Sequence, residues 1–194
     1  MRTTAPPLLP IFRSELQGRL LALLYSEPDR EQSITALARG LSSHVATVQR
    51  EVARLEEAGI LASERVGKTR LVRANLGSPY AEDLSSIVIK AFGPVPVLGA
   101  LLSAIPGVER AYLFGSWADR YVGVRGPVPA DVDVLVIGKP DRDAIDQVAL
   151  EAQEQVGREV NITIRSHKAW QRSDDGFLQS VRAGNLVPIV LQGR

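Results

Sequence analysis

The sequence of 194 residues contains no cysteine. This absence excludes disulfides and thiolate metal sites, and it is compatible with a reducing cytoplasm. No stretch reaches the roughly 18 uninterrupted apolar residues of a membrane-spanning helix. The first residues, MRTTAPPLLPIF, hold one arginine, two adjacent prolines and no apolar core of signal-peptide length. We therefore expect a cytoplasmic protein with no membrane partner.

Basic and acidic residues are nearly equal in number, which gives a net charge of +1, but they are unevenly distributed along the chain. Residues 1–76 carry 11 basic and 8 acidic side chains, a net charge of +3, whereas the remainder carries 12 and 14, a net charge of −2. At 45% hydrophobic residues the chain has enough apolar side chains for two small cores. The asymmetry favours two domains with different partners, the first of them a nucleic acid.

Three helices are expected in the basic part, over residues 14–25, 34–41 and 44–59, because apolar residues recur there at spacings of three and four residues. The polar pair at 42–43 separates the second helix from the third. Small polar and basic side chains lie on the exposed face of the third helix. This pattern is typical of a helix-turn-helix, although an ordinary helical hairpin with a basic face would show the same pattern.

Residues 60–76, ILASERVGKTRLVRANL, read as a strand, a Gly-Lys-Thr turn and a second strand. A basic hairpin directly after a recognition-type helix resembles the winged helix-turn-helix of the ArsR and MarR type regulators. The resemblance is carried by TVQREVARLEEAGILASERVGKTRLVRA. It implies that the module binds double-stranded DNA, with base-edge and phosphate contacts drawn from Ser43, Thr47, Arg50, Arg54, Lys68 and Arg70.

The apolar segment 77–106 reads as two helices broken at Gly93-Pro94. We expect it to connect domains at residues 1–76 and 107–194. Winged-helix regulators commonly dimerise to meet two half-sites, so the connector is the expected interface of a homodimer. The alternative is that its second helix packs on the sheet that follows.

Two aspartates interrupt an otherwise apolar strand, DVDVLVIG, at residues 131–138. Strand side chains alternate between faces, so Asp131 and Asp133 share one face. Two close carboxylates repel each other unless a cation lies between them, and Mg²⁺ or Mn²⁺ suits oxygen ligands of this kind. The alternative is that one aspartate caps the strand and the other faces solvent.

Upstream, a strand at 108–114 runs into Gly115-Ser116 and a short helix, WADRY. Gly115 allows the backbone to approach a phosphate, while Ser116 and Arg120 supply a hydroxyl and a guanidinium. The two halves together resemble the polymerase-beta type nucleotidyltransferase superfamily, and especially its minimal members. That resemblance implies an α/β (α+β) domain with a mixed sheet, a nucleoside triphosphate as ligand or substrate, and Asp131 and Asp133 as the catalytic metal ligands.

Active members of that superfamily have a third carboxylate on a later strand, which here reads REVNITIRS. The resemblance places Asn161 at that position, and Glu159 lies on the same face two residues earlier. An amide can ligate a metal but cannot act as a base. A second departure is the long loop at residues 121–130. The third strand therefore argues for nucleotide binding more strongly than for turnover.

The whole order resembles proteins in which an ArsR-like winged helix is fused to a minimal nucleotidyltransferase domain. The expected fold is a mainly α winged helix-turn-helix with a β-hairpin wing, followed by the α/β domain. The expected function is a transcriptional regulator whose second domain binds a nucleoside triphosphate with Mg²⁺. The alternative is an active nucleotidyltransferase that modifies a hydroxyl of a protein, an RNA or a small molecule and is localised by the winged helix.

Overall fold

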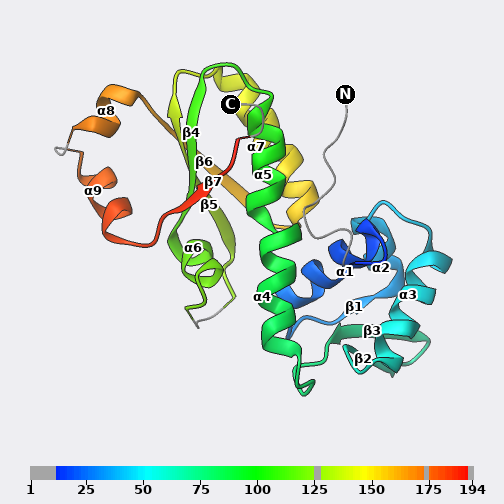
Figure 1. Ribbon diagram of the computed structural model, residues 1–194. Coiled ribbons are helices and arrows are strands. Elements are labelled where there is room, and N and C mark those ends of the chain that lie inside the picture. The colour runs from blue at the N-terminus through cyan, green and yellow to red at the C-terminus, as the bar shows by residue number, and fades with distance from the viewer. Residues whose placement is uncertain (1–11, 125–127, 173–174, 192–194) are drawn as a thin grey trace. The chain divides into compact units, whose positions relative to one another are not determined.

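The structure, a computed structural model, describes residues 12–124, 128–172 and 175–191 (Figure 1). The chain divides into two compact units, residues 1–93 and 94–194. The boundary falls inside the expected connector, because its first helix packs with the first unit and its second helix with the second. Residues 77–106 are thus shared between the units.

The first unit has the topology of a winged helix-turn-helix. Its strands form one antiparallel sheet in the order β1-β3-β2, in which β2 and β3 are the predicted hairpin. Its elements, in chain order, are α1 (Glu15–Ser26), β1 (Gln32–Ser33), α2 (Ile34–Gly40), α3 (Val45–Glu57), β2 (Leu61–Val66), β3 (Thr69–Ala74) and α4 (Ala81–Phe92). The predicted winged fold is confirmed.

Local signals set where these helices begin. The Ser14 and Ser33 hydroxyls accept hydrogen bonds from backbone N–H groups in the first turns of α1 and α2, as N-caps do. The apolar stripes of α1, α2 and α3 then pack with β3 and α4 into one core. The Tyr25 hydroxyl donates to the carbonyl of Ile60 at 2.9 Å and so ties α1 to the start of the hairpin.

The second unit is built on a mixed sheet, as predicted, and its strands lie in the order β6-β5-β4-β7. Strands β5 and β6 are parallel, whereas β4 is antiparallel to both β5 and β7. Its elements, in chain order, are α5 (Pro94–Ser103), β4 (Val108–Phe114), α6 (Gly115–Tyr121), β5 (Asp131–Gly138), α7 (Arg142–Val156), β6 (Glu159–Arg165), α8 (His167–Gln171), α9 (Gly176–Ala183) and β7 (Val187–Ile189).

One face of β5 is buried in the second half of the strand and only half-buried at its beginning. Leu135 and Ile137 are fully buried in a core that includes residues of α9, whereas Asp131 and Asp133, on the same face, are only half-buried. The two aspartates therefore lie at the end of the strand where the apolar cover stops. The opposite face, which includes Val132 and Val134, is buried.

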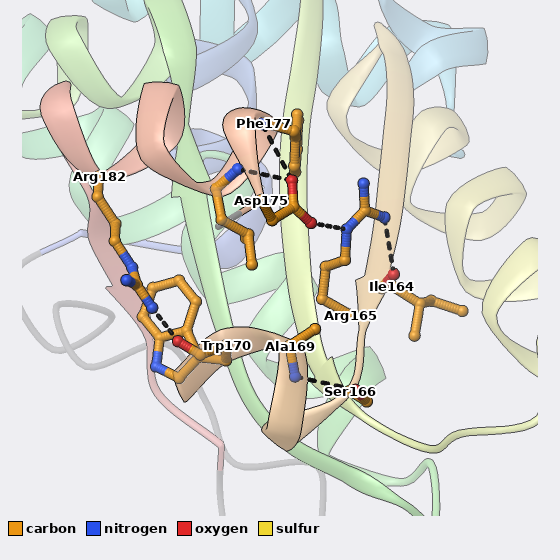
Figure 2. A network of polar contacts seen from close by, with 9 residues as sticks. Ile164, Arg165, Ser166, Ala169, Trp170, Asp175, Phe177 and Arg182 are labelled. Atoms are coloured by element: carbon orange, nitrogen blue, oxygen red, sulfur yellow. Dashed lines mark hydrogen bonds and ion pairs between the residues drawn. The ribbon is translucent and has the colours of Figure 1, made fainter. Parts of the chain in front are cut away.

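Helices α8 and α9 are held over the sheet by ring and ion-pair contacts (Figure 2). Trp170 stacks on Tyr112 with ring centroids 5.3 Å apart, and the guanidinium of Arg182 lies over its ring. Asp175 begins α9 by accepting from the backbone N–H groups of Leu178 and Phe177, and it also pairs with Arg165 at 3.2 Å. The hydrogen bond from Leu178 is the largest cause that lowers the pKa of Asp175, and the contacts with Arg165 and Phe177 add to it.

One helical stretch, Ala81–Ser103, is long and apolar enough to cross a membrane by length and composition alone, with a mean hydropathy of 1.7. The sequence-based expectation concerned uninterrupted apolar residues, and this stretch is interrupted by Glu82, Asp83 and Lys90. Core helices pass it as well, and 44% of this window is buried inside the structure. Val88 and Leu98, for example, are fully buried.

Gly18 provides a test of the first core. A Cβ added there would lie 2.2 Å from the Phe92 ring atom Cζ. We predict that Gly18→Ala lowers the free energy of unfolding, because overpacking costs about 1–3 kcal/mol and outweighs the helix preference for Ala of about 1 kcal/mol. Urea denaturation measures the change. In a Phe92→Leu background the same substitution should cost less, and an equal cost in both backgrounds would contradict the packing argument.

Candidate functional site

Helix α3 and the turn before it present only part of the predicted DNA-contacting set to solvent. Arg50 is exposed, while Thr47 on the helix and Ser43 in the preceding turn are half-buried. None of these three side chains is fully buried, and their predicted contacts with DNA stay a prediction. Helix N-terminal side chains of this kind are the ones that reach base edges in such folds.

Arg54 is engaged within the protein. Its Nη1 donates to the Glu51 carboxylate at 2.8 Å, and the same carboxylate accepts from Gln17 Nε2 at 2.9 Å. The Glu51 side chain is only 10% exposed, whereas Arg54 remains 42% exposed. The spacing of three residues along one helix is the sequence signal that was available for this pair.

The wing carries cations that form ion pairs within the described part of the protein and cations that do not. Arg70 pairs with Glu56 of α3 and donates to the Ser63 hydroxyl at 3.0 Å. Lys68 lies beside Gly67, whose φ of +61° forms the turn, and it is exposed like Arg65. Among the residues that the structure describes, Arg50, Arg65 and Lys68 have no ion-pair partner.

Asp131, Asp133 and Asn161 meet at the first half of the β5–β6 pair. In the parallel register Asp131 lies beside Glu159 and Asp133 beside Asn161. The Asn161 side-chain amide donates to Asp131 Oδ2 at 2.9 Å. The structure thus places an amide, rather than a carboxylate, in contact with the aspartate pair.

Electrostatics at this pair are unfavourable to two full negative charges. Burial raises the pKa of Asp133, the charge of Asp131 raises it further, and the Asn161 amide acts in the opposite direction. No group of three or more His, Cys, Asp or Glu side chains within the described ranges is arranged to hold a metal ion. Two carboxylates still fit Mg²⁺ if waters or ligand phosphates complete its shell.

The glycine of the Gly-Ser turn lies close to Asp133. Gly115 has a φ of +69°, and a Cβ added there would lie 3.0 Å from Asp133 Oδ2. The register explains this proximity, because Phe114 is the strand partner of Asp133. Ser116 follows and is exposed. The two halves that the sequence separates by a long loop therefore meet at one place.

Arg120 has a different environment from the one expected. It is half-buried, and burial lowers its pKa, with a further contribution from the charge of Arg158. Arg158 in turn donates to the carbonyl of Pro129, and its guanidinium lies 5.7 Å from the centre of the Trp117 ring. The sequence contained no signal for Arg158. Residues 125–127 of the predicted loop 121–130 lie outside the described residues.

We compared the chain with protein families, curated proteins and solved structures. No family model matches the chain, and no curated protein matches it. One solved structure that matches is MepR, a transcription regulator of the Staphylococcus aureus multidrug efflux pump MepA. The identity is 18% over 43% of this chain, with a TM-score of 0.36, and the match spans 63% of that regulator. The winged-helix assignment rests on the topology of the first unit itself.

The contact of Gly115 with Asp133 has a direct test. We predict that Gly115→Ala lowers the free energy of unfolding by more than Gly123→Ala does. Both positions have positive φ, which costs a residue with a Cβ about 1–2 kcal/mol, but a Cβ at Gly123 meets nothing within 4 Å. Urea denaturation followed by tryptophan fluorescence compares them. Equal losses would show that the Asp133 carboxylate moves aside freely.

Proposed function

We propose that this protein is a DNA-binding transcriptional regulator whose second unit binds a nucleoside triphosphate with Mg²⁺ or Mn²⁺. The observation that carries the nucleotide part is the proximity of the Gly115 backbone to Asp133, which shares one face of β5 with Asp131. The DNA part rests on the winged fold and its unpaired cations. Fold alone does not establish a function, so each part has a test of its own.

The proposed DNA surface comprises α3 and the wing tip. Arg50 on the helix and Arg65 and Lys68 on the wing are exposed and unpaired among the described residues. Cations of this kind bind phosphates and displace counterions, while Ser43 and Thr47 would contact base edges at the helix N-terminus. Arg54 is a weaker candidate because Glu51 already holds it.

We propose that the regulator acts as a homodimer, so that two winged helices meet two half-sites. Helix α4 and the residue before it expose apolar side chains in the first unit, with Tyr80 65% and Ile87 43% exposed. This supports the expectation that part of segment 77–106 contributes to the interface.

In the nucleotide part, Asp131 and Asp133 would hold the metal together with phosphate oxygens. The metal would supply positive charge that neutralises both the phosphates and the two carboxylates. Gly115 allows close approach of the backbone, and the exposed Ser116 hydroxyl can donate to a phosphate oxygen. Arg120 is kept as a phosphate-binding candidate on the adjoining helix.

The alternative is that the second unit is an active nucleotidyltransferase. In that reaction an acceptor hydroxyl would attack the α-phosphorus, form an ester bond and release pyrophosphate. Glu159 favours this function, because it lies beside Asp131 in the strand register. Asn161 disfavours it, because the group in contact with Asp131 is an amide that takes up no proton.

The DNA surface is tested by salt dependence. We predict that Arg50→Ala and Lys68→Ala each weaken binding of a fluorescein-labelled duplex of mixed sequence. Each should reduce the magnitude of the slope of log K against log salt by about 0.9, the value for one lost phosphate contact. Arg54→Ala should leave the slope unchanged. Fluorescence anisotropy at several salt concentrations measures the effect, and unchanged slopes for Arg50→Ala and Lys68→Ala would contradict the proposed surface.

The nucleotide site is tested by calorimetry with ATP, GTP, CTP and UTP, each with and without Mg²⁺. We predict that at least one binds only with Mg²⁺ and that Asp131→Ala/Asp133→Ala abolishes the binding. The control is Asp143→Ala/Asp146→Ala, which removes two exposed carboxylates of α7 and the same charge. It should bind as the wild type does.

Two other outcomes are informative. Absence of binding by the wild type would overturn the nucleotide part and leave the DNA part intact. Label from an α-phosphate that stays covalently attached to an acceptor, and is lost in Asp131→Ala/Asp133→Ala, would establish the enzyme instead.

A further inference from the structure

Arg70 joins three elements of the first unit. It lies on β3, its guanidinium pairs with Glu56 of α3, and its Nε donates to the Ser63 hydroxyl of β2 at 3.0 Å. The Arg70 side chain is 28% exposed and the Glu56 side chain 19%. An arginine held by two partners at once is fixed in direction as well as in position, because its donors form a planar fork.

The neighbouring strand explains why this pairing is needed. Arg65 is the direct cross-strand partner of Arg70, so two cations face each other on one side of the hairpin. Like charges in that arrangement destabilise a strand pair. The carboxylate of Glu56 compensates the charge of Arg70, and this leaves Arg65 as the cation directed to solvent.

The outer half of the wing has little else to hold it. The hairpin is anchored in the core at Leu61, Val72 and Ala74. Residues 63–69 are exposed, and a two-stranded ribbon is marginally stable by itself. Among the side-chain contacts described for residues 63–70, those of Arg70 join this outer half to α3.

We infer that Arg70 is a positioning residue, which sets the direction of the wing relative to the recognition helix through Glu56 and Ser63. The phosphate contacts of the wing then come from Arg65 and Lys68. This replaces the sequence-based assignment of Arg70 to a phosphate. A phosphate contact by Arg70 would require it to leave Glu56, and Arg65 and Arg70 would then face each other without compensation. The inference rests on the proposed binding of DNA.

Binding of the mixed-sequence duplex to Arg70→Ala and Glu56→Gln tests the inference. Both variants should weaken binding by about two- to fivefold, the range expected for loss of one partly exposed ion pair. The double variant should be no weaker than either, and the salt slope should not change. Glu57→Gln removes the same charge from the adjacent exposed position and should leave binding equal or tighter. If only the loss of one negative charge mattered, Glu56→Gln would likewise bind DNA equally or more tightly than the wild type.

Arg70→Lys separates position from charge. Lysine keeps the positive charge but lacks the planar set of guanidinium donors that contacts Glu56 and Ser63 together. Arg70→Lys should therefore weaken DNA binding nearly as much as Arg70→Ala does. The inference is overturned if Arg70→Ala reduces the slope magnitude by about 0.9 while Arg70→Lys and Glu56→Gln bind as the wild type does. Such a result would identify Arg70 as a phosphate contact.

Hydrogen exchange of the free protein provides a readout that does not depend on DNA. Amides of residues 63–70 should exchange faster in Glu56→Gln and in Arg70→Ala, with no change in α1. Unchanged exchange in both folded variants would overturn the inference. If the wild type binds no duplex but the exchange rates rise, the proposed DNA function fails while the positioning contact stands.

Discussion

The electrostatic cost of leaving a partly buried charge uncompensated governs the polar arrangement of both units. In the first unit, carboxylates of α3 hold Arg54 and Arg70. In the second unit, Asp131 and Asp133 share one face of β5, and the Asn161 amide offsets part of their repulsion. Pairing thus distinguishes the cations that are engaged within the first unit from exposed cations without an ion-pair partner among the described residues, whereas the repulsion between the two aspartates is only partly offset.

A backbone constraint is as important as charge in the second unit. The positive φ of Gly115 and the short distance from its Cβ position to Asp133 both favour a residue without a side chain. The antiparallel register of β4 and β5 brings the turn and the carboxylate together. The geometry is therefore a property of the strand pair, and it does not depend on the long loop between the strands.

Several features were predictable from local pattern. Apolar spacing located the helices of the first unit, the basic hairpin marked the wing, and period-two alternation placed Asp131 and Asp133 on one face. The same alternation placed Glu159 and Asn161 on a common face of β6, which the parallel register then brings beside the aspartates. These signals succeed because they depend on neighbours within about one helical turn or one strand.

Contacts between distant segments were not predictable in this way. Glu56 and Arg70 are separated by a hairpin strand and a turn, and no periodicity relates them, so the sequence did not indicate their ion pair. The break of the connector at Gly93-Pro94 was predicted, whereas the assignment of its two helices to different units came from the structure. The sequence by itself determined the winged helix and the aspartate pair, because both follow from local geometry. The tertiary structure alone decided that Glu56 compensates Arg70, because that pairing depends on which elements pack side by side.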